Sequence, residues 1–233
     1  MGQAGVPLPS PRAGGRGRSN GHAQVGYWSG VNLLAPDLRP RSLSLPYRVR
    51  PQEASCVDEE DVVTGSRETD RLILRHRRMD DAAVFHQLWT ERDPRVPPHR
   101  KIDGQGRPTV EDIATQIREE DEESAPGILA VKRKAAGDII GYCGLVFHGS
   151  GAPDEPELVF ELLRTAHGCG YATEAGQAVV GWSTEAGYER LWATVRDWNA
   201  ASRRVLEKLG FRETGQVEPD AVHGDSLLTV REV

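Results

Sequence analysis

The chain has 233 residues, a formal net charge of -6 and a hydrophobic fraction of 38%. That fraction is below the usual range for a globular chain, and the 25 glycines and 15 prolines indicate that part of the chain does not build a core. The acidic balance argues against nucleic acid as the main partner, because phosphate backbones are bound through basic faces.

Cysteine and histidine usage also excludes some classes of protein. Cys56, Cys143 and Cys169 are odd in number and far apart, which suggests neither a disulfide framework nor a zinc site. The histidines show no metal-ligand spacing, so we expect no metal. No apolar run approaches the roughly 18 residues of a membrane helix, and no signal-peptide pattern opens the chain. We therefore expect a cytoplasmic protein that has no membrane partner.

The first part of the chain has no sustained hydrophobic period. Residues 1–69 are dominated by Gly, Pro, Ser and Arg, and no amphipathic helix organises the arginines. We expect a low-complexity, disordered extension there, followed by a domain over residues 70–233.

The domain opens with a short apolar run, Arg71 to Arg75, that predicts a first strand. A helix should follow, capped by Asp80 or Asp81 and stopped before Asp93-Pro94. Residues 93–108 contain four prolines and two glycines, which predicts a long loop of the kind that often covers a site.

A second helix is predicted from Thr109, its probable cap, with Val110, Ile113 and Ile117 on one face. An acidic run, residues 119–123, follows it. The next two apolar runs, 128–131 and 139–147, flank a turn at 136–138 and predict a hairpin of two central strands. After a Gly/Pro-rich loop at 149–156, residues 157–163 predict a fourth strand.

A glycine turn, residues 167–172, follows that strand directly and leads into a helix that should end at Gly187. Residues 191–195 then predict a strand, and Asn199 is expected to cap a short helix that ends at Gly210. Phe211 onward and residues 226–230 supply two last strands. The sum is an α+β fold, a mixed sheet of about seven strands flanked by about four helices around one core.

The glycine turn is the strongest chemical signal. A strand that runs through Gly-x-Gly into a helix presents free backbone N–H groups and the positive end of a helix dipole, so it can bind phosphate. Glycine permits positive φ and close approach of a ligand. Taken alone, the pattern fits a mere turn equally well.

Several motifs resemble the GNAT acetyltransferases, in particular the RimJ/RimL branch. The superfamily turn (Gln/Arg)-x-x-Gly-x-(Gly/Ala) is similar to His167-Gly168-Cys169-Gly170-Tyr171-Ala172, with His at its first position. The continuation Ala172-Thr173-Glu174-Ala175, the run Asn199-Ala200-Ala201-Ser202 leading to Leu209-Gly210-Phe211, and the opening Thr69 to Arg75 are typical of the branch. The resemblance spans residues 69–233.

The resemblance implies acetyl-CoA as co-substrate and a GNAT fold. Turn residues His167, Gly168, Cys169, Gly170, Tyr171 and Ala172 would hold the pyrophosphate, through the backbone amides of 168–172. The pantetheine arm would lie along the fourth strand, with Asn199 and Ser202 facing it near the thioester. Local helix capping is the alternative role for both residues.

The family reaction is direct attack of an amine on the thioester, and the amine must be unprotonated. Glu157 is placed like the carboxylate that some members use as a base, and Glu161, on the same face of the strand, is the competitor. Leu206 stands where many members have a Tyr that acts as general acid, so Ser202 is the candidate proton donor to the thiolate. A nucleophilic role for Cys169 is disfavoured.

Two other functions remain open. A dinucleotide-binding oxidoreductase fits less well, since the turn lacks a third glycine and Asn199 and Ser202 would have no role. A non-catalytic acyl-CoA sensor or interaction module is compatible with Leu206. We expect the acceptor to be a primary amine, on a small molecule or a protein N-terminus. Both kinds of amine stay open, because fold does not fix substrate. A homodimer is left open.

Overall fold

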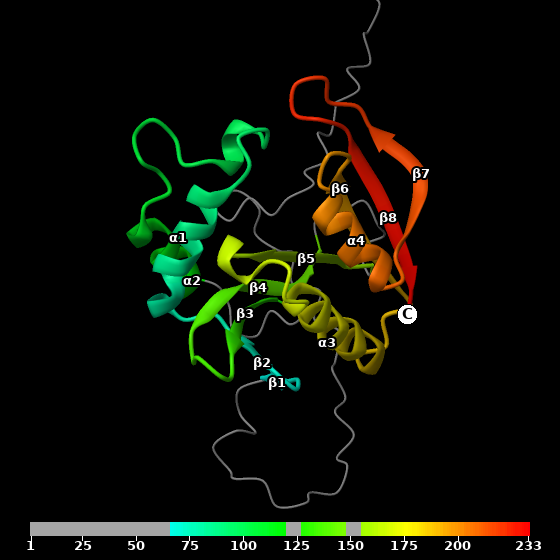
Figure 1. Cartoon of the computed structure of the whole chain (residues 1–233), viewed down its shortest axis with the longest axis horizontal. Helices are drawn as coiled ribbons and strands as arrows, with labels where there is room; N and C mark the ends of the chain where they lie inside the picture. Colours follow the sequence, from blue (N-terminus) through cyan, green and yellow to red (C-terminus); the bar gives the residue numbers. More distant parts are fainter. Residues whose placement is uncertain (1–65, 120–126, 148–154) are drawn as a thin grey trace, which may run out of the picture.

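Eight strands and four α-helices form the described part of the computed structural model, residues 66–119, 127–147 and 155–233 (Figure 1). The strands are β1 (Arg67–Glu68), β2 (Leu72–His76), β3 (Ile128–Arg133), β4 (Ile139–Val146), β5 (Glu157–Leu162), β6 (Arg190–Arg196), β7 (Arg212–Glu218) and β8 (Ser226–Glu232). The helices are α1 (Ala82–Glu91), α2 (Val110–Glu119), α3 (Tyr171–Glu185) and α4 (Ala200–Lys208), with short 3-10 turns at Met79–Asp81, Pro98–Arg100 and Arg164–Ala166.

These elements confirm the predicted α+β fold, with one more strand than the expected seven. The additional strand is β1, two residues long, which pairs with β2 just before the predicted start of the sheet. The predicted extension falls almost wholly on residues 1–65, which lie outside the described residues. The same holds for residues 120–126 and 148–154, which take up most of the expected acidic run and of the 149–156 loop.

The strands form one sheet in the order β1-β2-β3-β4-β5-β6-β8-β7. Every neighbouring pair is antiparallel except β5 and β6, which are parallel and share a single pair, Glu157 with Trp192. The Trp192 N–H donates to the Pro156 carbonyl at 3.0 Å. Past this point no further pair joins the two described strands. We call the opening between them the β5–β6 wedge.

Helices cover both faces of the sheet. Because side chains alternate along a strand, each strand can contribute to the core on either face. On β3, Leu129 and Val131 join the hydrophobic cluster that contains α3 and α4 residues, whereas Ile128 and Ala130 join the cluster of α1 and α2. The sheet therefore separates two cores. In Figure 1, α1 and α2 lie to one side of β5 and α4 lies beside β6 on the other, so the wedge is between these two groups of helices.

The predicted boundaries of the later helices are confirmed. Thr109 caps α2 through a reciprocal pair of bonds: its hydroxyl accepts the Asp112 N–H at 3.1 Å, and the Asp112 carboxylate accepts the Thr109 N–H at 2.8 Å. The chain leaves α3 and α4 through Gly187 and Gly210, with φ of +84° and +82°.

One predicted cap is wrong in its bonding. Asp81 directly precedes α1, but its side chain makes no capping bond to that helix. The carboxylate instead accepts from the guanidinium of Arg75 at 2.8 and 2.9 Å and from the Arg78 N–H at 2.8 Å. Asp81 has helical backbone angles, φ of -79° and ψ of -12°, because it lies inside the helical run that starts at Met79, and its carboxylate therefore reaches back to Arg78.

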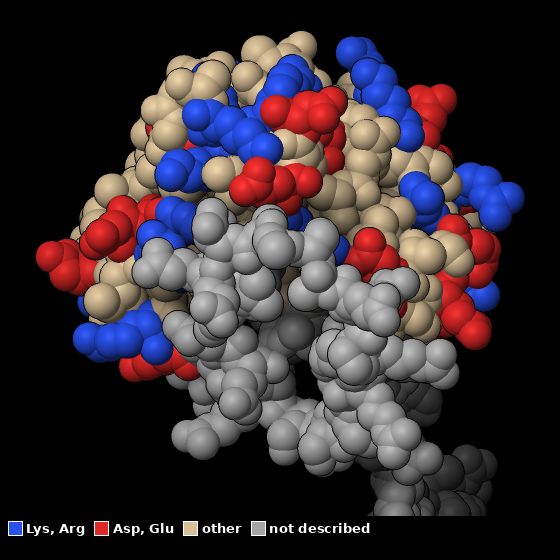
Figure 2. Space-filling model, turned by 90° about the horizontal axis from the view of Figure 1, so that it is seen from below, with Lys and Arg blue, Asp and Glu red and all other residues tan. Residues whose placement is uncertain are grey.

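Surface charge is mixed on the face shown in Figure 2. Blue and red side chains alternate there over the residues that are not drawn in grey, and no single sign dominates that area. No helix of the described residues is long and apolar enough to cross a membrane.

Candidate active site

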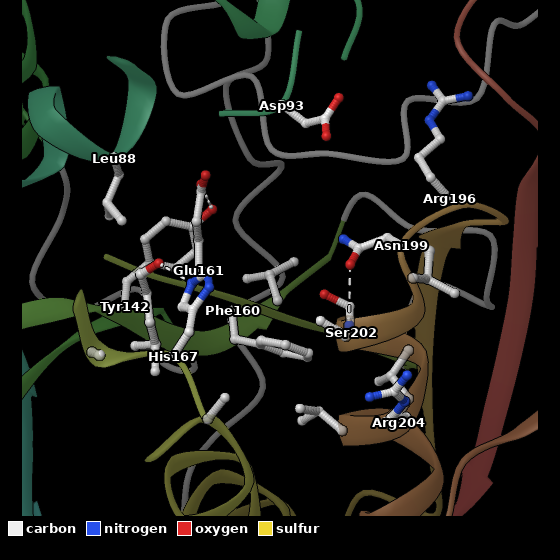
Figure 3. Close-up of a pocket in the computed structure, with 18 of the residues that line it drawn as sticks. Leu88, Asp93, Tyr142, Phe160, Glu161, His167, Arg196, Asn199, Ser202 and Arg204 are labelled. Carbon is white, nitrogen blue, oxygen red and sulfur yellow. Dashed lines mark hydrogen bonds between the residues drawn. The ribbon is translucent and has the colours of Figure 1, made fainter. Parts of the chain in front are cut away.

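A cleft of about 880 Å³ follows the β5–β6 wedge. Figure 3 shows its two sides: Tyr142, Glu161 and His167 lie opposite Asn199, Ser202 and Arg204, with Phe160 between them. The cleft therefore joins β5, the glycine turn, the start of α4 and the loop after α1. The sequence predicted site residues in β5, the glycine turn and the start of α4, and it predicted that the loop after α1 covers a site.

The glycine turn has the backbone that the sequence predicts. Gly168 and Gly170 adopt φ of +74° and +82°, and α3 begins at Tyr171. A Cβ at Gly168 would meet nothing within 4 Å, so glycine is required there by the backbone angle and not by crowding. The free N–H groups at the start of α3 are donors of the kind that bind anions at helix N-termini. Five of the six predicted turn residues line the cleft; Cys169 is not among them.

A long-range set of bonds braces the turn. The Glu174 carboxylate accepts from the Thr69 hydroxyl at 2.5 Å and from the Arg71 N–H and Nε at 2.9 and 2.7 Å. Arg71 Nη1 donates to the Cys169 carbonyl at 3.0 Å, and its guanidinium lies 4.6 Å from the centre of the Tyr171 ring. Two motifs that are about a hundred residues apart therefore hold the same turn.

His167 contacts the end of β5. Its Nε2 lies 2.8 Å from the Leu162 carbonyl oxygen, and its contact with the pyrophosphate stays a prediction. A carbonyl only accepts, so Nε2 carries the proton and donates. This bond ties the turn to the end of β5.

The wedge exposes one edge of β5. The Pro156 carbonyl faces β6, where it accepts from Trp192. Because backbone groups point to alternate sides of a strand, the N–H and C=O groups of Phe160, which lies past the pair of Glu157 with Trp192, face the same way. There the cleft replaces β6 as their neighbour, so an extended ligand can pair with this edge.

Glu157 is a buried carboxylate at the closed end of the wedge. Its exposed fraction is 4%, and its Oε1 accepts the Thr194 N–H at 3.0 Å. Burial raises the pKa of Glu157, against the opposing effects of Thr194 and of the positive charge of Arg100. A carboxylate with a raised pKa is suited to take up a proton.

Glu161 has the opposite setting. Its carboxylate pairs with Arg92 through bonds of 2.6 and 2.8 Å and accepts from the Tyr142 hydroxyl at 3.0 Å. Burial alone would raise the pKa of Glu161, but the bonds and charge of Arg92 lower it overall. Of the two candidate bases, Glu157 is therefore better suited to accept a proton.

Asn199 and Ser202 meet at the start of α4. The Asn199 side-chain oxygen accepts the Ser202 N–H at 3.1 Å, as the dashed line in Figure 3 shows. The predicted cap is thus confirmed. Both residues also line the cleft, together with Leu206, so capping and cleft lining are compatible in the same residues.

Sequence reasoning missed several cleft residues, all polar: Arg92, Arg100, Tyr142, Arg196, Arg204 and Lys208. A signal existed only for the last two, which lie four residues apart and so share one face of α4. The other four belong to a loop and to strands whose neighbours the sequence does not reveal.

The profile of the acetyltransferase (GNAT) domain matches residues 71–212, more than half of the chain. The chain therefore belongs to the GNAT acetyltransferase family, whose members transfer an acetyl group from acetyl-CoA.

Relatives and solved structures agree with this family. An uncharacterized N-acetyltransferase, p20, of Bacillus licheniformis is 28% identical over 155 residues, 63% of this chain and 82% of that protein. A GNAT-family acetyltransferase from Bacillus anthracis has a TM-score of 0.58 at 20% identity, over 72% of this chain and 98% of that one. The ribosomal-protein-S5-alanine acetyltransferase from Vibrio fischeri has a TM-score of 0.54 at 18% identity, over 72% and 96%.

Proposed function

We propose that the chain moves the acetyl group of acetyl-CoA to a primary amine, on a small molecule or a protein N-terminus, by direct attack on the thioester. The observation that carries this proposal is the β5–β6 wedge. It connects an anion site at one end, the glycine turn, to a buried carboxylate at the other, Glu157.

Three features of the wedge suit the cofactor. The amides of residues 168–172 can hold the pyrophosphate, and the free edge of β5 at Phe160 can pair with the amides of the pantetheine arm. Arg204 and Lys208 line the same cleft on α4 and carry the positive charge that the phosphates need. Asn199 and Ser202 would then lie beside the arm.

The reaction needs a proton moved from nitrogen to sulfur. The amine lone pair forms the new C–N bond with the thioester carbonyl carbon, the C–S bond breaks, and the products are the N-acetyl amine and free CoA. Glu157, directly or through one water, takes the proton from the amine. The Ser202 hydroxyl can donate a hydrogen bond to the departing thiolate, which is a tolerable leaving group because a thiol pKa is about 8.5. The thiolate takes its proton from solvent, and Glu157 returns the amine proton to solvent.

We place the chain in the RimJ/RimL branch of the family. Support comes from the branch motifs, which have physical roles in this fold: Thr69 and Arg71 bind Glu174, and Asn199 binds Ser202. The acceptor within this branch does not follow from these contacts.

A second candidate, an acyl-CoA sensor without turnover, is favoured by one observation. Leu206 is 3% exposed and occupies the position where many members have a Tyr that acts as general acid. A sensor would bind CoA and release no thiol when amines are added. Turnover of acetyl-CoA with an amine panel, followed by thiol release, separates the two functions.

The cofactor site is tested by Gly170→Leu. A branched side chain at φ of +82° is strained and would block the turn's amides, so we expect CoA binding by calorimetry to be lost. Gly181→Leu is the matched control, because Gly181 lies on the same helix, α3, with nothing within 4 Å of an added Cβ. Normal CoA binding by the Gly170 variant would overturn the assignment of the turn.

A further inference from the structure

Arg100 enters the cleft from the loop after α1, and its backbone is held firmly. Its N–H donates to the Pro97 carbonyl at 2.9 Å, and its own carbonyl accepts from Arg92 Nη1 at 3.1 Å. Arg92 is itself fixed, since it pairs with Glu161 and its guanidinium lies 4.1 Å from the centre of the Trp89 ring. Arg100 is therefore presented to the cleft on a rigid support.

The side chain of Arg100 is bonded to no carboxylate among the described residues. Its Nε is buried without a hydrogen-bond partner, and among the described residues its guanidinium forms no ion pair. Two other cleft arginines, Arg92 and Arg196, have carboxylate partners in Glu161 and Asp220. Burial lowers the pKa of Arg100, and the charge of Arg92 lowers it further, but a guanidinium starts above 12 and stays protonated at neutral pH.

A partly buried charge that no carboxylate is bonded to is unfavourable, and an anionic ligand bonded to it would reduce that penalty. The carboxylates near Arg100 do not remove it. Glu161 is taken up by Arg92 and Tyr142, and Glu157 accepts from the Thr194 N–H. The cleft thus offers a free planar donor group, which suits a carboxylate or a phosphate.

We propose that the acceptor is an amine that carries a carboxylate or phosphate a few bonds from its nitrogen, with Arg100 binding the anionic group while the amine lies at Glu157. This inference rests on the proposed function and adds a substrate class to it. Both charges of such an acceptor would be matched, the anion by Arg100 and the amine proton by Glu157.

Paired acceptors test the proposal on the full chain. The pairs are β-alanine with β-alaninamide, and 2-aminoethyl phosphate with 2-aminoethanol, and kcat/KM for thiol release is measured for each. For each pair, kcat/KM of the anionic acceptor is divided by kcat/KM of the neutral acceptor. This ratio in wild type is then divided by the same ratio in Arg100→Met, which gives the quotient used below. Because the same two amines stand in both ratios, their intrinsic reactivities cancel. The two pairs distinguish a carboxylate from a phosphate.

We expect the quotient to be about 10 to 100 for at least one pair, as for a lost charge-assisted hydrogen-bond pair. Arg100→Lys should restore part of the preference, and Arg118→Met, which removes an exposed arginine of α2, should leave the quotient near one. A quotient near one for Arg100→Met in both pairs overturns the proposal. So does an equal loss with neutral and anionic amines, which would mean that Arg100 acts only on Glu157.

Failure of the proposed function would look different. In that case no amine, neutral or anionic, would release thiol from acetyl-CoA, although CoA still bound. Melting temperatures of all variants show whether Arg100→Met folds, and the Lys variant keeps the test valid if it does not.

Discussion

Glu157→Gln is the change that most sharply tests the proposed chemistry. The substitution keeps the shape of a side chain that is 4% exposed, and the Gln carbonyl can still accept the Thr194 N–H. Only the ability to take a proton is removed. Loss of a general base typically costs about 10²- to 10⁴-fold, so we expect kcat/KM to fall in that range while the Kd for CoA stays within about twofold.

The pH profile supplies the decisive measurement. Because burial raises the pKa of Glu157, the wild-type kcat/KM should rise with pH through a value above the usual glutamate pKa of about 4.3. The part of that rise due to Glu157 should be absent from Glu157→Gln, which keeps only the rise that deprotonation of the amine gives to both enzymes. A variant that retains at least half of the wild-type kcat/KM, or one that is slower but keeps the same rise, would refute the role of Glu157 as base.

Stability gives an independent check with the opposite sign. A carboxyl with a raised folded pKa favours the protonated form, so its contribution to stability is complete below about pH 4.3 and is lost as pH rises through the folded pKa. Glu157→Gln should therefore melt higher than wild type at pH 8, and the difference should shrink towards pH 4. A lower melting temperature at pH 8 would show that the buried carboxylate stabilises the fold.

Two further predictions concern arginines that hold the site. Arg92→Met leaves the Glu161 carboxylate without its cation, so we expect the free energy of unfolding to fall by about 3–5 kcal/mol, or the melting temperature by about 6–20 °C in calorimetry. Adding Glu161→Gln should restore part of this stability. A shift below about 2 °C would contradict the prediction. Arg71→Ala removes the bond to the glycine turn and should weaken CoA binding about 2- to 10-fold by calorimetry. Arg67→Ala removes an exposed ion pair with Glu185 and should leave CoA binding unchanged. Equal effects of the two variants would refute the role of Arg71.

Local patterns predicted most of the fold. Periodicity and caps located the helices, as at Thr109 for α2 and Asn199 for α4, because these signals depend on residues within one or two turns. The glycine turn was predictable for the same reason, since Gly168 and Gly170 demand positive φ in any surroundings.

The sequence could not predict contacts between distant segments. Arg92 and Glu161 are 69 positions apart, and nothing in either segment indicates that they pair. Their pairing decides which glutamate is free to act as a base. The wedge is also a property of the sheet as a whole, because it depends on β5 and β6 sharing one pair and then separating. For that reason Arg100 could not be assigned to the cleft in advance.

The cap at Asp81 shows the same limit on a shorter scale. A local rule offers its carboxylate to the start of α1, but Arg75 lies within reach and takes it. Local rules predict where a helix begins more reliably than which atoms satisfy its first turn.

The central claim is that the wedge holds acetyl-CoA with its thioester next to Glu157, and the most direct measurement is a crystal structure of the full chain with CoA. We expect the pyrophosphate at the amides of residues 168–172, the pantetheine amides paired with Phe160, and the sulfur between Glu157 and Ser202. CoA bound outside the wedge, or with its sulfur directed away from Glu157, would contradict the account.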